Sequence, residues 1–133
     1  GSHISRGLAA RGIELVLLDC AEAPLTALAN ELSARVKVAT YVANQADLDG
    51  FAVIVGSIAE RHPDLDLIVA NAGIDLPQKL TAPDWRLAKK HFDVNAISNY
   101  VLFSALVPRF VARSKGCTVS ARPPVLRTIG TVP

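Results

Sequence analysis

The chain has 133 residues and a formal net charge of +2; 50% of its residues are apolar and 20% are charged. This length and composition predict one globular domain with a core of its own. The small net charge, without a lysine and arginine cluster interleaved with aromatic residues, argues against a nucleic-acid or membrane partner. The longest purely apolar runs are also far shorter than the ~18 residues that a membrane span requires.

The cysteines and histidines predict no metal site. Cys20 and Cys117 lie far apart and lack metal-ligand spacing, which favours two reduced thiols in a cytoplasmic protein. His62 and His91 are both expected on the surface, without a ligand partner at suitable spacing. Residues 1–3, Gly-Ser-His, are interpreted as a tag remnant without functional weight, and the start of the chain has no signal-peptide pattern.

Helical and strand patterns alternate along the chain. Helices are expected at 4–10, 24–32, 46–61 and from 83 to about 113, and strands at 13–18, 36–42, 67–70 and 117–120. Thr81 and Asp84 are spaced like a capping box for the long helix, and Pro108 is expected to kink or end its first part. The alternation predicts an α/β fold with a doubly wound parallel sheet.

The most informative stretch is the run from Leu67 to Ala70, which stops abruptly at Asn71-Ala72-Gly73. The run is typical of a parallel strand that is buried on both faces. Ligands of open α/β sheets bind in the crevice beyond the carboxyl ends of the strands. We therefore expect Asn71, Ala72 and Gly73 to lie at a ligand-binding edge.

Asp19 ends the first apolar strand of the pattern. In dinucleotide-binding βαβ units, an acid at such a strand end accepts hydrogen bonds from the adenosine ribose hydroxyls. Its charge would repel a 2′-phosphate and favour NAD over NADP. The alternative is a solvated aspartate, or one that caps the next helix.

Three motifs in this order, Leu17-Leu18-Asp19, Asn71-Ala72-Gly73 and Asp93-Val94-Asn95, resemble the short-chain dehydrogenase/reductase family. The resemblance covers roughly residues 4–120. It implies a Rossmann-like fold, an NAD cofactor with NADP less favoured, and hydride transfer between nicotinamide and an alcohol or carbonyl substrate. Asn95 resembles the family's structural and proton-relay asparagine and is the catalytic candidate; alternatively, it only binds backbone carbonyls.

The chain also departs from the family's pattern. The family's first strand and glycine-rich loop are missing, and His3 and Ser5 stand where loop glycines are expected. Tyr41 stands where the family usually has an aspartate that positions the adenine. Ser120 lies slightly too early in the chain for the family's catalytic serine.

The Tyr-x-x-x-Lys pair of the family is missing as well, because Tyr41 is followed four residues later by Gln45 and Tyr100 by Ser104. In the family this tyrosine is the general acid/base, and the lysine lowers its pKa. We therefore expect an incomplete Rossmann-like domain at residues 4–120, without its first strand and C-terminal third, that is inactive as given. The last thirteen residues, 121–133, are expected to be an atypical tail.

The resemblance implies that the missing strand would lie between the strand ending at Asp19 and the one ending at Asn71. Three arrangements could close this gap: the flanking strands pair directly, a partner chain contributes a strand, or the segment 124–132 fills the gap. The second function hypothesis is a non-catalytic module for binding or association. The helix at 83–113 resembles the family's main dimer helix, which predicts a homo-oligomer.

Overall fold

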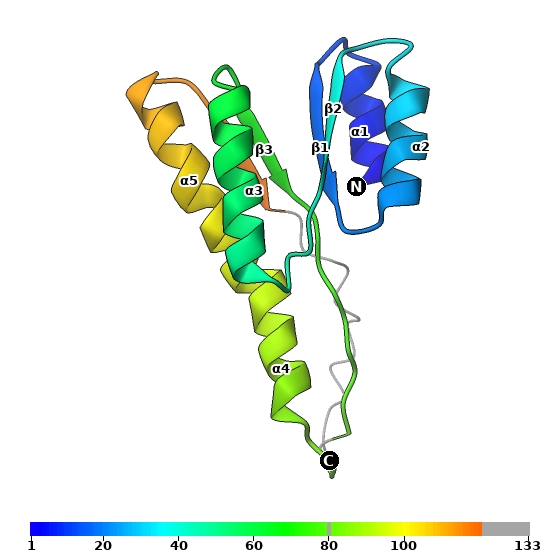
Figure 1. Cartoon of the computed structure of the whole chain (residues 1–133), viewed down its shortest axis with the longest axis vertical. Helices are drawn as coiled ribbons and strands as arrows, with labels where there is room; N and C mark the ends of the chain where they lie inside the picture. The colour runs from blue at the N-terminus through cyan, green and yellow to red at the C-terminus, as the bar shows by residue number, and fades with distance from the viewer. Residues whose placement is uncertain (80, 121–133) are drawn as a thin grey trace, which may run out of the picture.

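The computed structural model describes residues 1–79 and 81–120, and the predictions for the 121–133 tail lie outside this part of the chain. Strands form a middle layer with helices on both faces, as Figure 1 shows. The element order is α1 (Ser2–Ala9), β1 (Leu15–Asp19), α2 (Glu22–Leu32), β2 (Val38–Val42), α3 (Leu48–Arg61), β3 (Leu67–Ala70), α4 (Trp85–Phe92), a π-helical turn (Asp93–Ile97), α5 (Ser98–Ala112) and β4 (Cys117–Ser120). This is the α/β architecture that the sequence predicted.

The strands form two parallel pairs. β1 pairs with β2, with Leu15 opposite Val38, and β3 pairs with β4, with Leu67 opposite Cys117. β1 and β3 are not hydrogen-bonded to each other, so the described residues form two separate two-stranded sheets. Direct pairing of the two flanking strands, one of the three expected arrangements, is therefore wrong.

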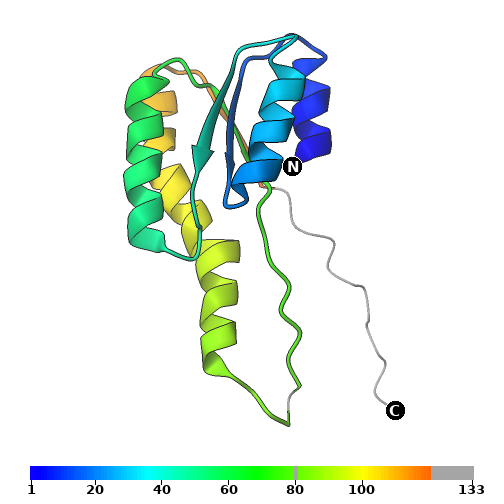
Figure 2. The same ribbon diagram turned by 45° about the vertical axis from the view of Figure 1, so that its right-hand side comes forward.

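The helices on the two faces of the strand layer form two separate core clusters with the strands, because the strands place apolar side chains toward both faces. One core cluster joins β1 to α1 and α2 through Ala9, Leu15, Leu17, Leu25, Ala29 and Leu32. The other joins β3 to α3 and α5 through Ala43, Phe51, Val55, Ala59, Ile68, Leu106 and Phe110. Figure 2 shows the two helix pairs on either side of the strands. The fold therefore has two cores on opposite faces of the strand layer.

Helix α1 begins earlier than the sequence analysis expected. Ser2 and His3 form its first turn, and Gly1 O accepts a hydrogen bond from Ser5 N at 3.0 Å. The helix ends where it was expected to end, because Gly12 adopts a positive φ of 76° just after it. Residues interpreted as a tag remnant thus take part in the folded structure.

The long helical region is continuous but contains one turn of π-helix at Asp93–Ile97. It begins at Asp84, whose carboxylate accepts from Arg86 N at 2.9 Å, so the expected capping box of Thr81 with Asp84 is wrong. Pro108 lies inside α5, which continues to Ala112. The irregularity of this region is therefore the π turn, where an extra residue per turn enters the helix.

By length and composition alone, the helical region Trp85–Ala112 could cross a membrane; it has 28 residues and a mean hydropathy of 1.2 in its most apolar window. The lengths of the purely apolar runs in the sequence did not indicate this helix. A core helix of a soluble protein passes the same test. Here α5 packs on α3, with Leu106 and Phe110 in the shared core. Within the described residues it is the one such helix.

Two valines on α3 provide a matched test of this packing. Val55 is fully buried, whereas Val53 is 72% exposed. We expect Val55→Ala to lower the free energy of unfolding by about 2 kcal/mol, because it removes two buried methyl groups and leaves a cavity. Val53→Ala should change it by less than about 0.5 kcal/mol. Urea denaturation followed by circular dichroism measures both, and equal effects would contradict the assigned core.

Candidate functional site

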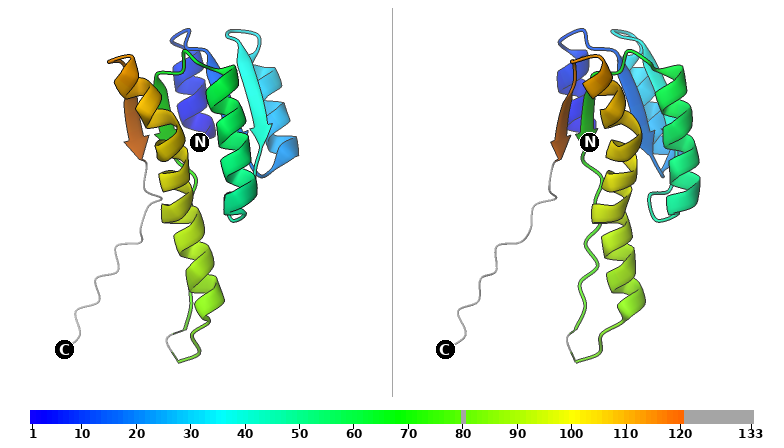
Figure 3. Two further views of the ribbon diagram at one scale, coloured as in Figure 1. Left: turned by 60° about the vertical axis from the view of Figure 1, so that its left-hand side comes forward. Right: turned by 90° about the vertical axis from the view of Figure 1, so that its left-hand side faces the viewer.

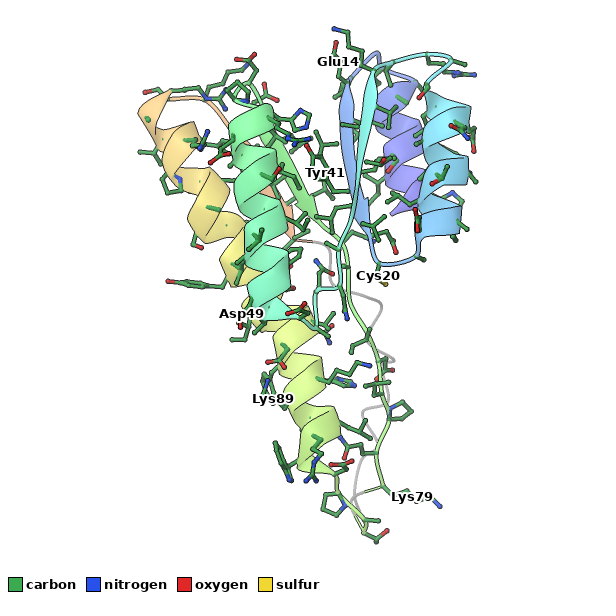
Figure 4. The ribbon with its side chains drawn as sticks, in the orientation of Figure 1. Glu14, Cys20, Tyr41, Asp49, Lys79 and Lys89 are labelled. Carbon is green, nitrogen blue, oxygen red and sulfur yellow. The ribbon has the colours of Figure 1, made fainter. Side chains whose placement is uncertain are left out.

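The carboxyl ends of β1, β2 and β3 lie at one edge of the strand layer. Asp19 ends β1, Asn44 follows β2 closely, and Asn71 follows β3 directly. Figure 4 shows Cys20, the residue after Asp19, in the loop at this edge. A cavity of about 1180 Å³ is lined by Asp19, Asn71 and Ala72, together with residues of β1 and β3. The structure therefore brings the first two predicted motifs to one cavity.

Asp19 is exposed at the end of β1, and its Oδ1 accepts a hydrogen bond from Ala21 N at 2.9 Å. This contact stabilises the turn after β1. Helix α2 has no side-chain cap, so Asp19 does not cap it, whereas its exposure agrees with the alternative of a solvated aspartate. The contact with Ala21 N occupies one carboxylate oxygen. Oδ2 accepts no hydrogen bond from the described residues, so the carboxylate can bind a ligand hydroxyl without leaving the turn.

The segment after β3 begins with a half-buried Asn71, followed by the exposed Ala72 and Gly73. Gly1 lies against it, since a Cβ at Gly1 would be 3.5 Å from the Asn71 Nδ2 atom. The start of α1 therefore meets the carboxyl end of β3. The first turn of α1 has no acidic residue and no side-chain cap, so its free N–H groups face this edge.

Asn95 fixes the coil that follows Gly73. Its Oδ1 accepts from Ile74 N at 2.8 Å, and its Nδ2 donates to Ile74 O at 2.8 Å. Asn99 Nδ2 in turn donates to Asn95 O at 3.1 Å. Both polar atoms of the Asn95 side chain thus bind the backbone of Ile74, which agrees with the alternative that Asn95 has a structural role. The catalytic role of Asn95 stays a prediction.

Helix α4 extends beyond the strands, and the coil at 71–79 runs beside it, as both views of Figure 3 show. Besides Asn95, His91 joins the two segments, because its Nε2 accepts a hydrogen bond from Leu76 N. His91 is half-buried, so its expected place on a solvated face is wrong. A backbone amide only donates, so this contact requires an unprotonated Nε2. Sequence spacing offered no signal for it, since fifteen residues separate the partners.

The side chain of Tyr41 turns away from the carboxyl edge of the strands, toward His62. Tyr41 is a residue of β2, and its hydroxyl lies 2.9 Å from Nε2 of the half-buried His62, at the end of α3. The Tyr41 backbone pairs with Leu18, one residue before Asp19, while its side chain lies above Cys20 in Figure 4. His62 ends α3 as expected, but it is half-buried and contacts Tyr41 instead of being fully solvated. The polar residue after β2 is Asn44, whose Oδ1 accepts from Ala46 N at 3.0 Å.

An ion pair links the residues that precede β3 and β4. Lys115 Nζ lies 2.7 Å from the Asp66 carboxylate and, by hydrogen bonding to it, lowers the pKa of Asp66. This pair joins the entry to β3 with the entry to β4. Within residues 1–79 and 81–120, no group of three or more His, Cys, Asp or Glu side chains is placed to hold a metal ion.

Comparison with known proteins gives a family match. The family described as short chain dehydrogenase matches residues 1–121. None of the curated proteins compared with the chain matches it.

Solved structures resemble the fold closely. A metagenomic short-chain oxidoreductase in complex with NADP has a TM-score of 0.83 and 23% identity, with 90% of this chain and 55% of that chain covered. An alcohol dehydrogenase from the archaeon Thermococcus sibiricus, complexed with 5-hydroxy-NADP, has a TM-score of 0.81 and 24% identity, covering 90% and 52%. An NADH-dependent reductase complexed with NAD has a TM-score of 0.80 and 20% identity, covering 90% and 53%. This chain thus spans about half the length of these structures.

The contacts of Asn95 give a test of its positioning role. We expect Asn95→Ala to lower the free energy of unfolding by about 1–3 kcal/mol, because Ile74 loses partners for both its N–H and its C=O. Amide exchange at Ile74 should accelerate selectively, which NMR measures. The matched control is Asn30→Ala, at an exposed position on α2. Unchanged exchange at Ile74 would remove Asn95 from this role.

Proposed function

We propose that this chain, which belongs to the short-chain dehydrogenase family, forms the adenosine-binding part of a nicotinamide-dependent oxidoreductase. The observation that supports this is the placement of Asp19 and Asn71 at the same carboxyl edge of the parallel strands β1 and β3. In such sheets this edge is where dinucleotides bind. The whole enzyme would move a hydride between nicotinamide and an alcohol or carbonyl substrate.

The residues at this edge fit the adenosine half of the cofactor. Asp19 offers a carboxylate oxygen to the ribose hydroxyls, and its negative charge disfavours the 2′-phosphate of NADP. We therefore propose NAD as the preferred cofactor. Five of the solved structures with this fold hold NADP, NADPH or an NADP derivative and one holds NAD, so the preference rests on Asp19 alone.

The pyrophosphate and nicotinamide halves have fewer partners in this chain. The first turn of α1 offers free backbone N–H groups near Asn71, but it lacks the glycine-rich loop that lets a backbone approach a pyrophosphate closely. Neither Tyr41 nor Tyr100 has a lysine four residues later. We propose that this chain alone binds the cofactor weakly and does not turn over substrate.

The cofactor proposal is tested on the 133-residue chain by titration with NAD and with NADP, followed by NMR shifts of the Ala21 and Asn71 amides. NAD should bind more tightly than NADP. Asp19→Ala should lower the ratio of the two dissociation constants about fivefold, as expected for the removal of one charge that acts at close range near the surface. Glu22→Ala, which removes a nearby exposed acid, is the matched control.

Equal or tighter binding of NADP by the unmutated chain would refute the role of Asp19. The same samples should form no NADH when an alcohol is added, because neither tyrosine of the chain has a lysine four residues later to lower its pKa. Alcohol-dependent NADH formation would show that the chain is active alone.

A second function, association through α4 and α5, has its own support. Trp85, Phe92, Tyr100 and Val111 are exposed, and all but Trp85 are more than two-thirds exposed. Their spacing of 7, 8 and 11 residues places them on one side of the helical region, the π turn supplying the extra residue. We propose that this stripe contacts a second copy of the chain.

Sedimentation velocity tests this association. The unmutated chain should sediment as a dimer or larger species at micromolar concentration, because burial of the stripe removes apolar surface from water. Tyr100→Glu combined with Val111→Glu should shift it to the monomer. Val53→Glu, at an equally exposed site on α3, should not. A folded monomer before any substitution would contradict the proposal.

The two cysteines bear on the cellular compartment of the protein. Cys20 and Cys117 are free and exposed thiols. Because exposed thiols persist in a reducing environment, we propose that the protein is cytoplasmic. The substrates that we propose are small molecules, and we propose neither a nucleic-acid partner nor a membrane partner.

A further inference from the structure

The coil at 71–79 runs beside α4, and every second residue in its middle part is partly covered (Figure 3). Ile74, Leu76 and Gln78 are half-buried, whereas the residues between them are exposed. Such alternation is typical of an extended segment with one covered face. These three residues are therefore the points at which the coil contacts the helical region.

The outer two of these contacts use acceptors that do not titrate. Asn95 Oδ1 accepts from Ile74 N at 2.8 Å, and Gln78 Oε1 accepts from Asp84 N at 2.8 Å. A side-chain amide oxygen carries no titratable proton, so it accepts a hydrogen bond at acid and at neutral pH alike. These two contacts attach both ends of the half-buried stretch at any pH in this range.

The middle contact depends on protonation. His91 Nε2 accepts a hydrogen bond from Leu76 N. A ring nitrogen accepts only when it carries no hydrogen, so the bound ring is neutral and its hydrogen is on Nδ1. In the protonated ring both nitrogens are donors, and Nε2–H would point at the N–H of Leu76. Because two donors cannot bond each other, the protonated ring does not hold the coil.

Histidine is the one titrating side-chain type at this contact in the range between pH 5 and 8. The coil contributes the exposed Asp75 and Lys79. The charged side chains of α4, of its N-cap and of the π turn are Asp84, Arg86, Lys89, Lys90 and Asp93. Lys89 and Asp93 form an ion pair with each other. Unperturbed aspartate, lysine and arginine side chains keep their charge in this range, so a change in the contact there reports the histidine.

We infer that His91 is a pH-dependent positioning residue: its neutral ring holds Leu76, and with it the coil at 71–79, against α4, and protonation of the ring releases them. Because the bound Nε2 cannot carry a proton, protonation and attachment exclude each other, and attachment weakens as the pH falls. The coil begins at Asn71, at the carboxyl edge of β3, so the release frees the segment that leaves the candidate site. This inference does not rest on cofactor binding, and its test uses no cofactor.

Amide exchange at Leu76 tests the release. It is measured by NMR on the 133-residue chain and corrected for the intrinsic pH dependence of exchange. Protection should fall about tenfold from about pH 7.5 to about pH 5.5, because the released ring takes up a proton that the bound ring cannot hold. Protection at Ile74 should stay constant, since its acceptor does not titrate. Constant protection at Leu76, or an equal loss at Ile74, would overturn the inference.

Nitrogen chemical shifts of the His91 ring give an independent readout. At neutral pH the ring should carry its hydrogen on Nδ1, because Nε2 accepts from Leu76 N. A ring that only fills space between the coil and α4 would not require this form. A hydrogen on Nε2 at neutral pH would overturn the inference, because such a nitrogen donates and cannot hold the amide.

Substitution by glutamine separates the hydrogen bond from the titration. In His91→Gln, Oε1 takes the place of Nε2 as acceptor and carries no titratable proton. Protection at Leu76 should therefore not change with pH, whether or not the glutamine holds the amide. The matched control is His62→Gln, at the other half-buried histidine, which should leave the pH dependence at Leu76 intact. Persistent pH dependence in His91→Gln, or its loss in His62→Gln, would assign the effect to another group and overturn the inference.

Discussion

The hydrogen-bonding requirement of strand edges governs this structure. The backbone N–H and C=O groups of a parallel strand point to its two edges at alternate residues, so both edges offer groups for hydrogen bonding. β2 and β4 satisfy the outer-facing groups of β1 and β3 respectively, while the groups of Val16, Leu18, Leu67 and Val69 face the cavity between the pairs. The molecule therefore has two separate strand pairs, and two cores cover opposite faces of the strand layer.

The parallel direction of β1 and β3 also places the candidate site residues. Because β1 and β3 run parallel, their carboxyl ends meet at one side, and Asp19 and Asn71 therefore line one cavity although 52 positions separate them. The coil beyond Asn71 then leaves the strand layer along α4. Asn95 and His91 hold it there by accepting from the Ile74 and Leu76 amides, so the geometry of this edge depends on the helical region as well as on the strands.

The helical region serves two packing roles. Its α5 part contributes Leu106 and Phe110 to the core on α3, while Phe92, Tyr100 and Val111 remain exposed. The π turn between α4 and α5 shifts the helix face by one residue, and Asn95 lies within it. A side chain that bonds another segment of the chain thus accompanies the irregular turn, as is common for π-helical insertions.

The sequence by itself determined the alternation of helices and strands, the parallel class of the sheet and the strand ends at Asp19 and Asn71. These depend on local periodicity and on polar residues that interrupt apolar runs, which neighbouring residues make visible. Gly12 likewise ended α1 where expected, because only a local positive φ is involved. The family motifs added the expected strand order and cofactor class.

Only the tertiary structure decided which partners the polar side chains have. Tyr41 meets His62 across 21 positions, and His91 meets Leu76 across 15, at distances that no periodic pattern encodes. Asn44 follows β2 and accepts a hydrogen bond from Ala46 N, because the strand ends at Val42 and the chain turns there. Whether β1 and β3 would pair directly was equally hidden, since strand pairing depends on the packing of helices from distant parts of the chain rather than on the strand residues alone.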